Sequence, residues 1–343
     1  MHLLPTTNPS GRERAMVTEY PPLRLKSDEE ALLFKVIAPE PEWKERLLSR
    51  LSHKGPLWDK PMNNALEAGL EGMTMYFFQL RLGDVAVGNL TIVEALDRPI
   101  ALLQHVFTDP DHRRKGICNS MMQAMVDDFR ARDGRAMYLG TGYDTPPYHI
   151  YRSFGFEGIG TTGAMVWALD DAYPESYFAG GPVLLRPMRW GDWAPLTALY
   201  QQIDGWDLRG YCFGQFGHSS YESTFCRLQE VIEEGKAAHA TVLEDTTTGA
   251  VIGHAFIMQD EKWPGGPKVL ECFVHPRYED RTPELLSAVA AAADTRLKAY
   301  ADADASGKLD ALEQIGFGRE ALLKAQYVRK DGRAADVVVL TRR

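Results

Sequence analysis

The feature that most constrains the fold of this chain is a long internal repeat within its 343 residues. The pentapeptide RSFGF at 152–156 has a counterpart, EQIGF, at 313–317, and VFTDP at 106–110 resembles CFVHP at 272–276. The repeat length is about 160 residues, which is far longer than the unit of a solenoid. The pattern therefore indicates two tandem copies of one domain.

A stretch rich in proline and glycine separates the two copies. Residues 173–182 read YPESYFAGGP, a composition that is typical of a linker. Hydrophobic residues make up 45% and charged residues 25% of the chain, which excludes a disordered or fibrous protein. We therefore expect a flexible N-terminal segment at 1–20, a first domain at 21–172, a linker at 173–182 and a second domain at 183–343.

The hydrophobic pattern of the first copy predicts a mixed α/β domain with an antiparallel start and a βαβ end. A strand, an Asp28 cap and a helix are expected over 22–34, and the same order around Asp192 over 182–199. The remaining expected elements are strands at 74–82, 85–93 and 100–108, a helix at 117–132, a strand at 135–141, a short helix at 146–154 and a strand at 161–169.

Charge and cysteine content narrow the classes of partner and compartment. There are 38 basic and 47 acidic residues, a net charge of −9, so the chain is not expected to bind nucleic acid by bulk charge. The four cysteines form no C-x-x-C pair, which disfavours a zinc site or a disulfide framework and favours the cytoplasm. No apolar run reaches the ~20 residues that a membrane span needs, so no membrane partner is expected.

One segment of the first copy carries the pattern of an anion site. Residues 106–118 read VFTDPDHRRKGIC: a strand ends at Thr108, a proline enforces a turn, and a helix begins near Gly116. The turn places Arg113, Arg114 and Lys115 beside the N–H groups that open the helix. Such a combination suits a pyrophosphate. The alternative is a solvated basic turn that only caps a helix.

These residues resemble the GNAT superfamily of acyl-CoA N-acyltransferases. Its hallmark is Gln/Arg-x-x-Gly-x-Gly/Ala after a strand, and here Arg113-x-x-Gly116-x-Cys118 stands in that place. Cys118 departs from the usual glycine or alanine, although it is small enough to preserve the loop. A second hallmark, a short helix with a tyrosine followed by Gly-Phe, is matched by Tyr151 and Gly155-Phe156.

The resemblance implies two tandem GNAT-like domains and direct transfer of an acetyl group from acetyl-CoA to an amine of a small molecule or peptide. It implies that Tyr151 protonates the departing thiolate and that backbone N–H groups near Phe107 polarise the thioester. The residues that it implies for binding acetyl-CoA are Val106, Phe107, Thr108, Arg113, Arg114, Lys115, Gly116, Ile117, Cys118, Asn119, Asp144 and Tyr148.

The base that deprotonates the amine is not fixed by the sequence. Relatives often carry Glu or His at the position of Leu102 or Gln104, and Gln104 could only orient a water or the substrate. Period-two alternation puts His105 on the opposite face of the strand, where a structural role is expected unless a bulge turns the strand. Gln104 and His105 are the catalytic candidates on this strand, and Asp144, His149 and Glu94 stay open as proton acceptors.

The second copy lacks the residues of the anion site. Thr282 and Pro283 replace Gly116 and Ile117, Glu279 and Asp280 replace part of the basic cluster, and Leu312 replaces Tyr151. Because proline has no N–H and carboxylates repel phosphate, this copy is predicted not to bind CoA.

Residues 302–313 fit the pattern of an EF-hand calcium loop, but no metal is expected there. The gapless repeat alignment places 296–303 on a strand, where an EF-hand needs a helix. We expect instead a strand-to-helix turn capped by Ser306 or Asp304.

Other functions stay open beside N-acetyl transfer. The chain could be a non-catalytic acyl-CoA-binding sensor, as the missing strand carboxylate suggests, or an O-acyltransferase or decarboxylase on the same fold. The acceptor, the acyl chain length and the formation of a homodimer are not fixed by the sequence.

Overall fold

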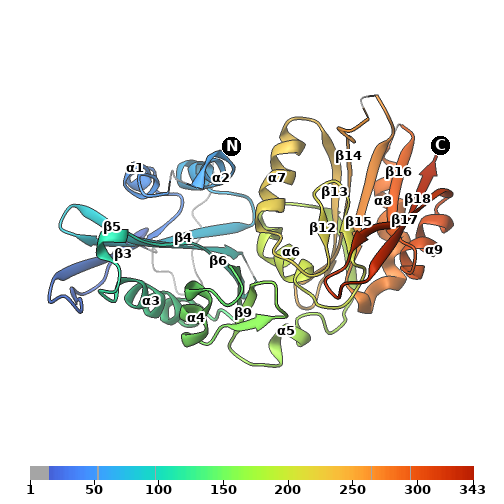
Figure 1. Cartoon of the computed structure of the whole chain (residues 1–343). Coiled ribbons are helices and arrows are strands. Elements are labelled where there is room, and N and C mark those ends of the chain that lie inside the picture. Colours follow the sequence, from blue (N-terminus) through green and yellow to red (C-terminus); the bar gives the residue numbers. More distant parts are fainter. Residues whose placement is uncertain (1–14, 52–53, 97, 264, 294) are drawn as a thin grey trace. The chain divides into compact units, whose positions relative to one another are not determined.

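The computed structural model describes residues 15–51, 54–96, 98–263, 265–293 and 295–343. The chain forms two compact units (Figure 1). Unit 1 comprises Met1–Leu70, Thr74–Ile92 and Gln104–Asp128, and unit 2 comprises Glu71–Met73, Val93–Leu103 and Phe129–Arg343. No helix in the part of the chain that the structure describes is long and apolar enough to cross a lipid bilayer.

Unit 1 is built on a sheet with the strand order β1-β3-β4-β5-β6, with β2 paired to β3. Its helices α1 and α2 lie on one face of this sheet and α3 lies on the other (Figure 1). The bounds are β1 Val17–Glu19, β2 Leu23–Arg24, β3 Glu30–Ile37, α1 Lys44–Leu48, α2 Pro56–Ala68, β4 Met73–Leu82, β5 Val85–Ala95, β6 Ile100–Thr108 and α3 Ile117–Ala131.

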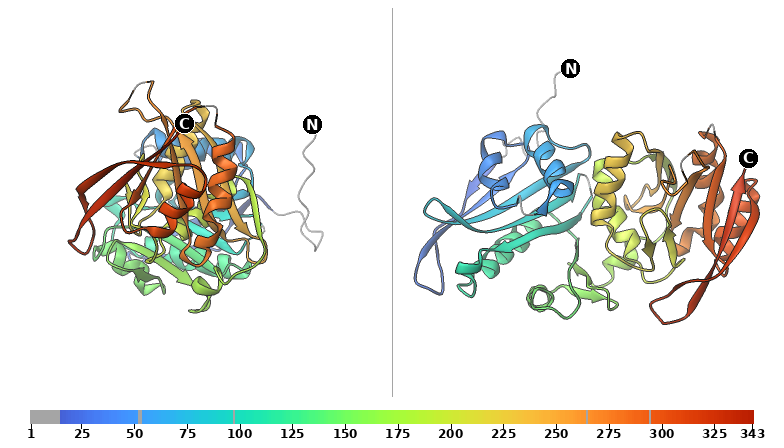
Figure 2. Two further views of the ribbon diagram at one scale, coloured as in Figure 1. Left: turned by 90° about the vertical axis from the view of Figure 1, so that its right-hand side faces the viewer. Right: turned by 45° about the horizontal axis from the view of Figure 1, so that its top comes forward.

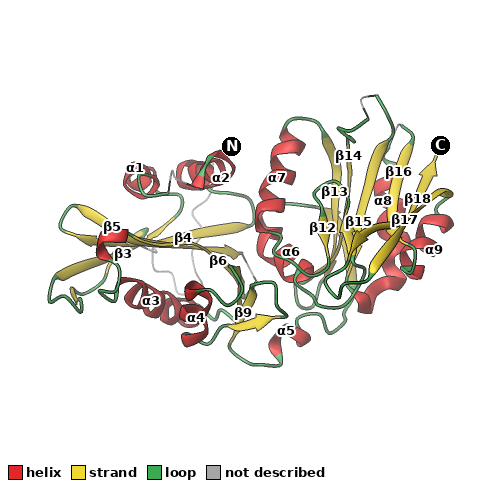
Figure 3. Cartoon of the chain, in the orientation of Figure 1, coloured by secondary structure: helices red, strands yellow, loops and turns green. Residues whose placement is uncertain are grey.

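The prediction of a helix after Asp28 is wrong, because this segment forms strand β3 (Figure 3). Asp28 adopts φ 66°, and the N–H of Leu25 donates to the carbonyl of Glu29 at 2.9 Å, so the chain makes a tight hairpin from β2 into β3. β3 then pairs with β1 on one side and β4 on the other. The flexible segment expected at 1–20 therefore contains a paired strand, Val17–Glu19, while residues 1–14 lie outside the described residues.

Helix α3 confirms the amphipathic pattern read from the sequence. Five apolar side chains along this helix are buried: Met121, Met122, Met125, Val126 and Phe129. The helix packs directly on β5, because a Cβ on Gly88 would lie 2.6 Å from Ile117 and 2.8 Å from Met121. Close contact of this kind fixes where the start of α3 lies relative to the sheet of unit 1.

The described residues of unit 2 contain part of the first large sheet, a second large sheet, and a two-stranded sheet formed by β11 and β12. The first continues from β6 in the order β6-β7-β9-β8, and β6 runs parallel to β7 over Ile100–Leu102 and Ala136–Tyr138. The elements of this part are β7 Ala136–Gly140, α4 Pro146–Ser153, β8 Glu157–Ile159, β9 Ala164–Ala168 and α5 Tyr173–Ser176.

The second sheet of unit 2 has seven strands in the order β10-β13-β14-β15-β16-β18-β17. Helices α6 and α7 cover one of its faces, and α8 and α9 cover the other (Figures 1 and 2). The bounds are β10 Val183–Pro187, α6 Trp193–Tyr200, β11 Leu208–Gly210, β12 Gln215–Phe216, α7 Glu222–Glu233, β13 Ala237–Asp245, β14 Val251–Met258, β15 Lys268–Val274, α8 Thr282–Ala291, β16 Leu297–Asp302, α9 Ser306–Gln314, β17 Gly318–Val328 and β18 Ala334–Arg342.

The strand order of the second sheet repeats that of β3-β4-β5-β6-β7-β9-β8, position by position. Local hydrogen bonds repeat as well: the N–H of Phe156 donates to the carbonyl of Tyr151 at 3.2 Å, and that of Phe317 to Leu312 at 3.0 Å. Gly155 and Gly316 adopt φ 88° and 93° at the ends of the two helices. Positive φ at these positions explains why both copies carry glycine there.

A cluster of buried charges lies within unit 2. Arg98 and Arg186 both bond the carboxylates of Asp192 and Glu244, and the side chains of Arg98 and Asp192 are 5% and 0% exposed. Burial acts to raise the pKa of Asp192, but the hydrogen bonds and charge of Arg186 hold it below its usual value. Asp192 also accepts the N–H of Arg189 at 2.9 Å, so it stabilises the turn that leads into α6.

Candidate active site

A bulge interrupts strand β6 at His105. This residue has φ 54°, and its carbonyl accepts a hydrogen bond of 2.6 Å from the side-chain amide of Asn89 on β5. The imidazole lies edge-on to the ring of Trp58 on α2, with 5.2 Å between ring centres. The strict alternation expected along β6 is therefore wrong beyond Gln104, and the bulge places His105 against α2. No motif or spacing in the sequence pointed to Asn89 as a residue of this site.

The turn after β6 is held by Asp109. Its carboxylate accepts the N–H of Asp111 at 3.1 Å, and its own N–H donates to the carbonyl of Val87 on β5 at 2.9 Å. The hydrogen bonds from Asp111 and from His112 hold the pKa of Asp109 below its usual value. A charged cap at pH 7 fixes the direction in which the chain leaves the sheet.

The chain then forms a concave run of backbone donors before α3. Arg114 adopts φ 64° and Gly116 φ 90°, and left-handed residues of this kind turn successive N–H groups toward one point. The first helical bond of this segment runs from the N–H of Ser120 to the carbonyl of Gly116 at 3.0 Å. The N–H groups of Ile117, Cys118 and Asn119 therefore have no partner within the helix and can receive an anion.

Two of the three basic side chains of this turn are free to meet an anion. Arg113 and Arg114 are exposed, and neither has an acidic partner among the residues that the structure describes. Lys115 instead bonds the carboxylate of Glu29 at 2.8 Å, which lowers the pKa of that carboxyl group. We call residues 113–119, with these two arginines and the open N–H groups, the cradle.

Cys118 lies inside the cradle at the position where the sequence departs from Gly or Ala. Its side chain is partly buried, and burial raises the pKa of the thiol to about 11. The thiol is therefore neutral at physiological pH and adds no negative charge to the cradle. All four cysteines, which lie in described segments, are free.

The residues expected downstream of the cradle lie on or beside α4. Tyr148 and Tyr151 are 8% and 9% exposed, and Tyr151 packs on Phe156 with 6.0 Å between ring centres. Asp144 and His149 form an exposed pair at 3.0 Å. Residues 104–119 lie in unit 1, whereas Asp144, Tyr148, His149 and Tyr151 lie in unit 2.

The equivalent turn of the second copy keeps its cap but loses one of its backbone donors. His275 takes the place of Asp109: its ring accepts the N–H of Arg277 at 3.2 Å, and its own N–H donates to Ile252 at 2.8 Å. Helix α8 then begins at Thr282 with Pro283 in its first turn. The carboxylate of Glu279 lies over the start of α9, since a Cβ on Gly307 would be 2.5 Å from its Oε2.

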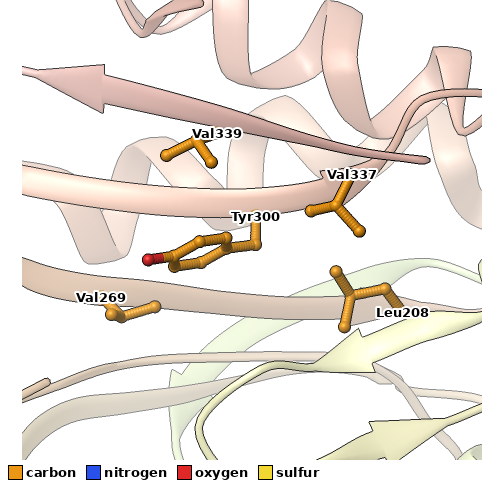
Figure 4. Packing of buried hydrophobic residues seen from close by; sticks show 5 residues of the cluster. All are labelled: Leu208, Val269, Tyr300, Val337 and Val339. Atoms are coloured by element: carbon orange, nitrogen blue, oxygen red, sulfur yellow. The ribbon is translucent and has the colours of Figure 1, made fainter. Parts of the chain in front are cut away.

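The second copy also fills the space beside its parallel strand pair with its own chain. Strands β15 and β16 pair only at 268–269 and 297–298, and residues 206–212, which we call the plug segment, lie against both strands. Leu208 of this segment belongs to a buried hydrophobic cluster with Val269 on β15, Tyr300 on β16, and Val337 and Val339 on β18 (Figure 4).

Polar contacts fix the plug segment in place. The N–H of Leu208 donates to Asp302 at 2.8 Å, and its carbonyl accepts from Lys308 at 3.2 Å. Glu271 on β15 accepts the N–H groups of Tyr211 and Cys212 at 3.0 and 2.6 Å. These four bonds satisfy the backbone of a segment that enters the sheet, as buried polar groups require.

Arg209 anchors the chain that leads into the plug segment. Its guanidinium is buried and donates to the carbonyls of four residues, Tyr200, Gln202, Asp204 and Trp206, at 2.7–3.1 Å. Burial lowers the pKa of this guanidinium to about 10, so it stays charged at neutral pH. The long connection between α6 and α7 is the only trace of this arrangement that the sequence carries.

The residues that fit the calcium-loop pattern, 302–313, run from the end of a strand into a helix. Residues 297–302 form strand β16, as the repeat alignment predicted, and α9 begins at Ser306. The expected cap is wrong: Ala305 occupies the N-cap, and Asp304 bonds Arg329 at 2.6 Å instead. Within the described ranges, no three His, Cys, Asp or Glu side chains are grouped as metal ligands would be.

Comparison with known families identifies the segment that holds the cradle. Residues 90–159, which run from β5 through the cradle to β8, match the family model described as Acetyltransferase (GNAT) domain. This segment is a GNAT domain. The resemblance inferred from Arg113, Gly116 and Tyr151 is thereby confirmed, and the mixed α/β fold agrees with it.

Solved structures of this superfamily are similar to less than half of the chain. A phosphinothricin acetyltransferase from Sinorhizobium meliloti, in complex with AcCoA, is 20% identical, with 47% of this chain and 87% of that chain covered at a TM-score of 0.40. Spermidine N-acetyltransferase from Vibrio cholerae, in complex with CoA and spermine, is 15% identical, with 47% and 94% covered at 0.38. The comparison with curated proteins finds no match.

Proposed function

We propose that the first copy transfers an acetyl group from acetyl-CoA to an amine of a small molecule or peptide. The observation that carries the proposal is the cradle within the GNAT domain. It combines inward-turned N–H groups, the start of α3 and two exposed arginines that have no acidic partner among the described residues. A diphosphate needs such a site, because backbone donors fix its oxygens while arginines offset its charge.

The bulge at His105 supplies the second requirement of the reaction. A bulge leaves one residue of a strand outside the ladder of hydrogen bonds, so a backbone N–H next to it can point to a ligand. Such a donor near Phe107 would stabilise the oxygen of the thioester as negative charge develops on it. Asn89 holds the bulge through the carbonyl of His105 and would keep this donor in position.

Proton transfer is assigned to His105, Gln104 and Tyr151. Since the bulge turns His105 toward α2, its imidazole becomes the proposed base for the acceptor ammonium. Gln104, which is 4% exposed, would orient a water or the substrate. Tyr151 would protonate the thiolate that leaves, as the family resemblance implies.

The second copy would serve a structural role and bind no CoA. Its plug segment lies against β15 and β16, and Pro283 removes one of the donors at the start of α8. In the first copy, the connection between α1 and α2 spans 49–55, whereas the connection between α6 and α7 spans 201–221. Calorimetric titration with CoA should therefore give one site per chain, and two equivalent sites would contradict this role.

The test is an amine panel assayed with acetyl-CoA for release of free thiol. The proposal expects thiol release with at least one amine and formation of the N-acetylated product by mass spectrometry. Acetyl-CoA binding without thiol release for any acceptor would identify a sensor instead. Release with alcohols alone would indicate O-acylation, and either result would overturn the proposal.

A further inference from the structure

The hairpin between β2 and β3 lies directly on the cradle. The N–H of Lys26 donates to the carbonyl of Lys115 at 3.0 Å, and the carboxylate of Glu29 bonds the ammonium of Lys115 at 2.8 Å. Ser27 also donates to Glu29, at 2.5 Å. One backbone bond and one ion pair thus tie 26–29 to the turn that precedes α3.

The side chain of Lys26 runs across Gly116. A Cβ built on Gly116 would lie 3.6 Å from Cγ and 3.9 Å from both Cδ and Cε of Lys26. The stem of Lys26 therefore covers the glycine, and its ammonium lies one bond beyond Cε. Lys26 is exposed, and no carboxylate in the described part of the chain pairs with its ammonium.

Without Lys26, the cradle has too little positive charge to balance the phosphate groups of acetyl-CoA. Lys115 is the lysine of the basic run, but Glu29 neutralises it. Arg113 and Arg114 would then have to offset the negative charge of a substrate that carries a diphosphate and a 3′-phosphate. A further cation held over the same glycine would offset part of this negative charge, and a lysine stem can lie along apolar surface while its ammonium stays in water.

We propose that Lys26 is a phosphate-binding residue for acetyl-CoA, supplied by the β2–β3 hairpin. The inference rests on the proposed function and adds a contact from outside the 90–159 segment that carries the family pattern. The ion pair between Glu29 and Lys115 holds the hairpin on the cradle. The ammonium of Lys26 then binds the phosphate groups of CoA from the side of the hairpin.

The experiment compares Lys26→Ala with Arg24→Ala by calorimetric titration with acetyl-CoA. Arg24 is a matched control: it lies on the same hairpin, carries the same charge, and pairs with Asp28 at 3.2 Å. Lys26→Ala should raise the Kd roughly tenfold and weaken its dependence on salt, while Arg24→Ala should change it less than twofold. Lys26→Arg should restore most of the affinity.

Two further donors locate the contact. An equal loss with 3′-dephospho-CoA would place Lys26 on the diphosphate, and disappearance of the loss would place it on the 3′-phosphate. S-acetylpantetheine, which has no phosphate, should show no difference between wild type and Lys26→Ala in kcat/KM. Unchanged Kd in a folded Lys26→Ala variant, or an equal loss in Arg24→Ala, would overturn the inference and leave the proposed function intact. Failure of the wild type to bind acetyl-CoA would instead refute the proposed function.

Discussion

Replacing Leu208 by alanine removes a buried side chain of the plug segment. Leu208 is 2% exposed and belongs to one buried cluster with Val269, Tyr300, Val337 and Val339 (Figure 4). Loss of three methylene equivalents costs about 2.4 kcal/mol at ~0.8 kcal/mol each. The cavity left behind brings the expected loss in the free energy of unfolding to about 3–4 kcal/mol.

The backbone bonds from Leu208 to Asp302 and Lys308 survive this substitution, since alanine keeps both the N–H and the carbonyl. The measured loss therefore reports packing alone. For a domain of this size, 1 kcal/mol shifts Tm by about 2–4 °C, so the expected decrease in Tm is roughly 6–16 °C. CoA stoichiometry should stay at one per chain, because the space gained provides no phosphate donors.

Urea unfolding followed by tryptophan fluorescence is a suitable assay, since Trp206 is buried in the same plug segment. Leu322→Ala is the matched control: Leu322 lies on β17 and is 50% exposed, so its loss should cost at most ~0.5 kcal/mol. A loss below about 1 kcal/mol for Leu208→Ala, or an equal loss in the control, would refute the claim that the plug segment stabilises the second sheet.

Three further predictions concern the site and the core. Tyr151→Phe deletes only the hydroxyl, so kcat should fall at least ~10-fold while Tm and acetyl-CoA affinity stay near wild type; a full kcat would return Tyr151 to a packing role. Gly116→Ala places a side chain at φ 90° without a steric clash, so the backbone strain is roughly 1–2 kcal/mol. This strain should weaken acetyl-CoA binding about tenfold in calorimetry. Unchanged affinity would contradict the proposal that the cradle binds acetyl-CoA. Burial lowers the pKa of His254 to about 3, so below pH 6.5 the unfolded chain binds a proton that the fold does not. As the pH is lowered from 6.5 to about 3, the free energy of unfolding should therefore fall by up to ~1.4 kcal/mol per pH unit. Urea titrations at several pH values should show that His254→Phe reduces this slope. A substitution of the exposed His239 should leave the slope unchanged.

Local pattern was enough to predict the elements whose structure depends on their own residues. Helix α3 follows from the spacing of its methionines, and the cradle follows from a strand, a proline and a basic run in fixed order. Strand β3 could not be predicted in this way. Its sequence EALLFKVI suits a helix equally well, and the pairing with β1 and β4 decides its conformation.

The features that the sequence did not reveal depend on contacts between distant residues. The bulge at His105 is held by Asn89 on another strand, and Lys26 reaches the cradle from far upstream. The plug segment is recognisable only once β15 and β16 are seen to separate. No periodicity or motif encodes such contacts, because they follow from the tertiary fold.

The buried charges around Asp192 bear on how this protein can be divided. Arg98 belongs to the connection between β5 and β6 of the first copy, whereas Arg186, Asp192 and Glu244 belong to the second. A truncation after the linker would remove both carboxylates together with the chain that buries Arg98, so the first copy would lose these ion pairs and expose a surface that is now covered. A chain cut at 182 should therefore be recovered as insoluble or protease-sensitive material. The salt-bridge network around Asp192 therefore makes residues on both sides of the 173–182 segment depend on each other for stability.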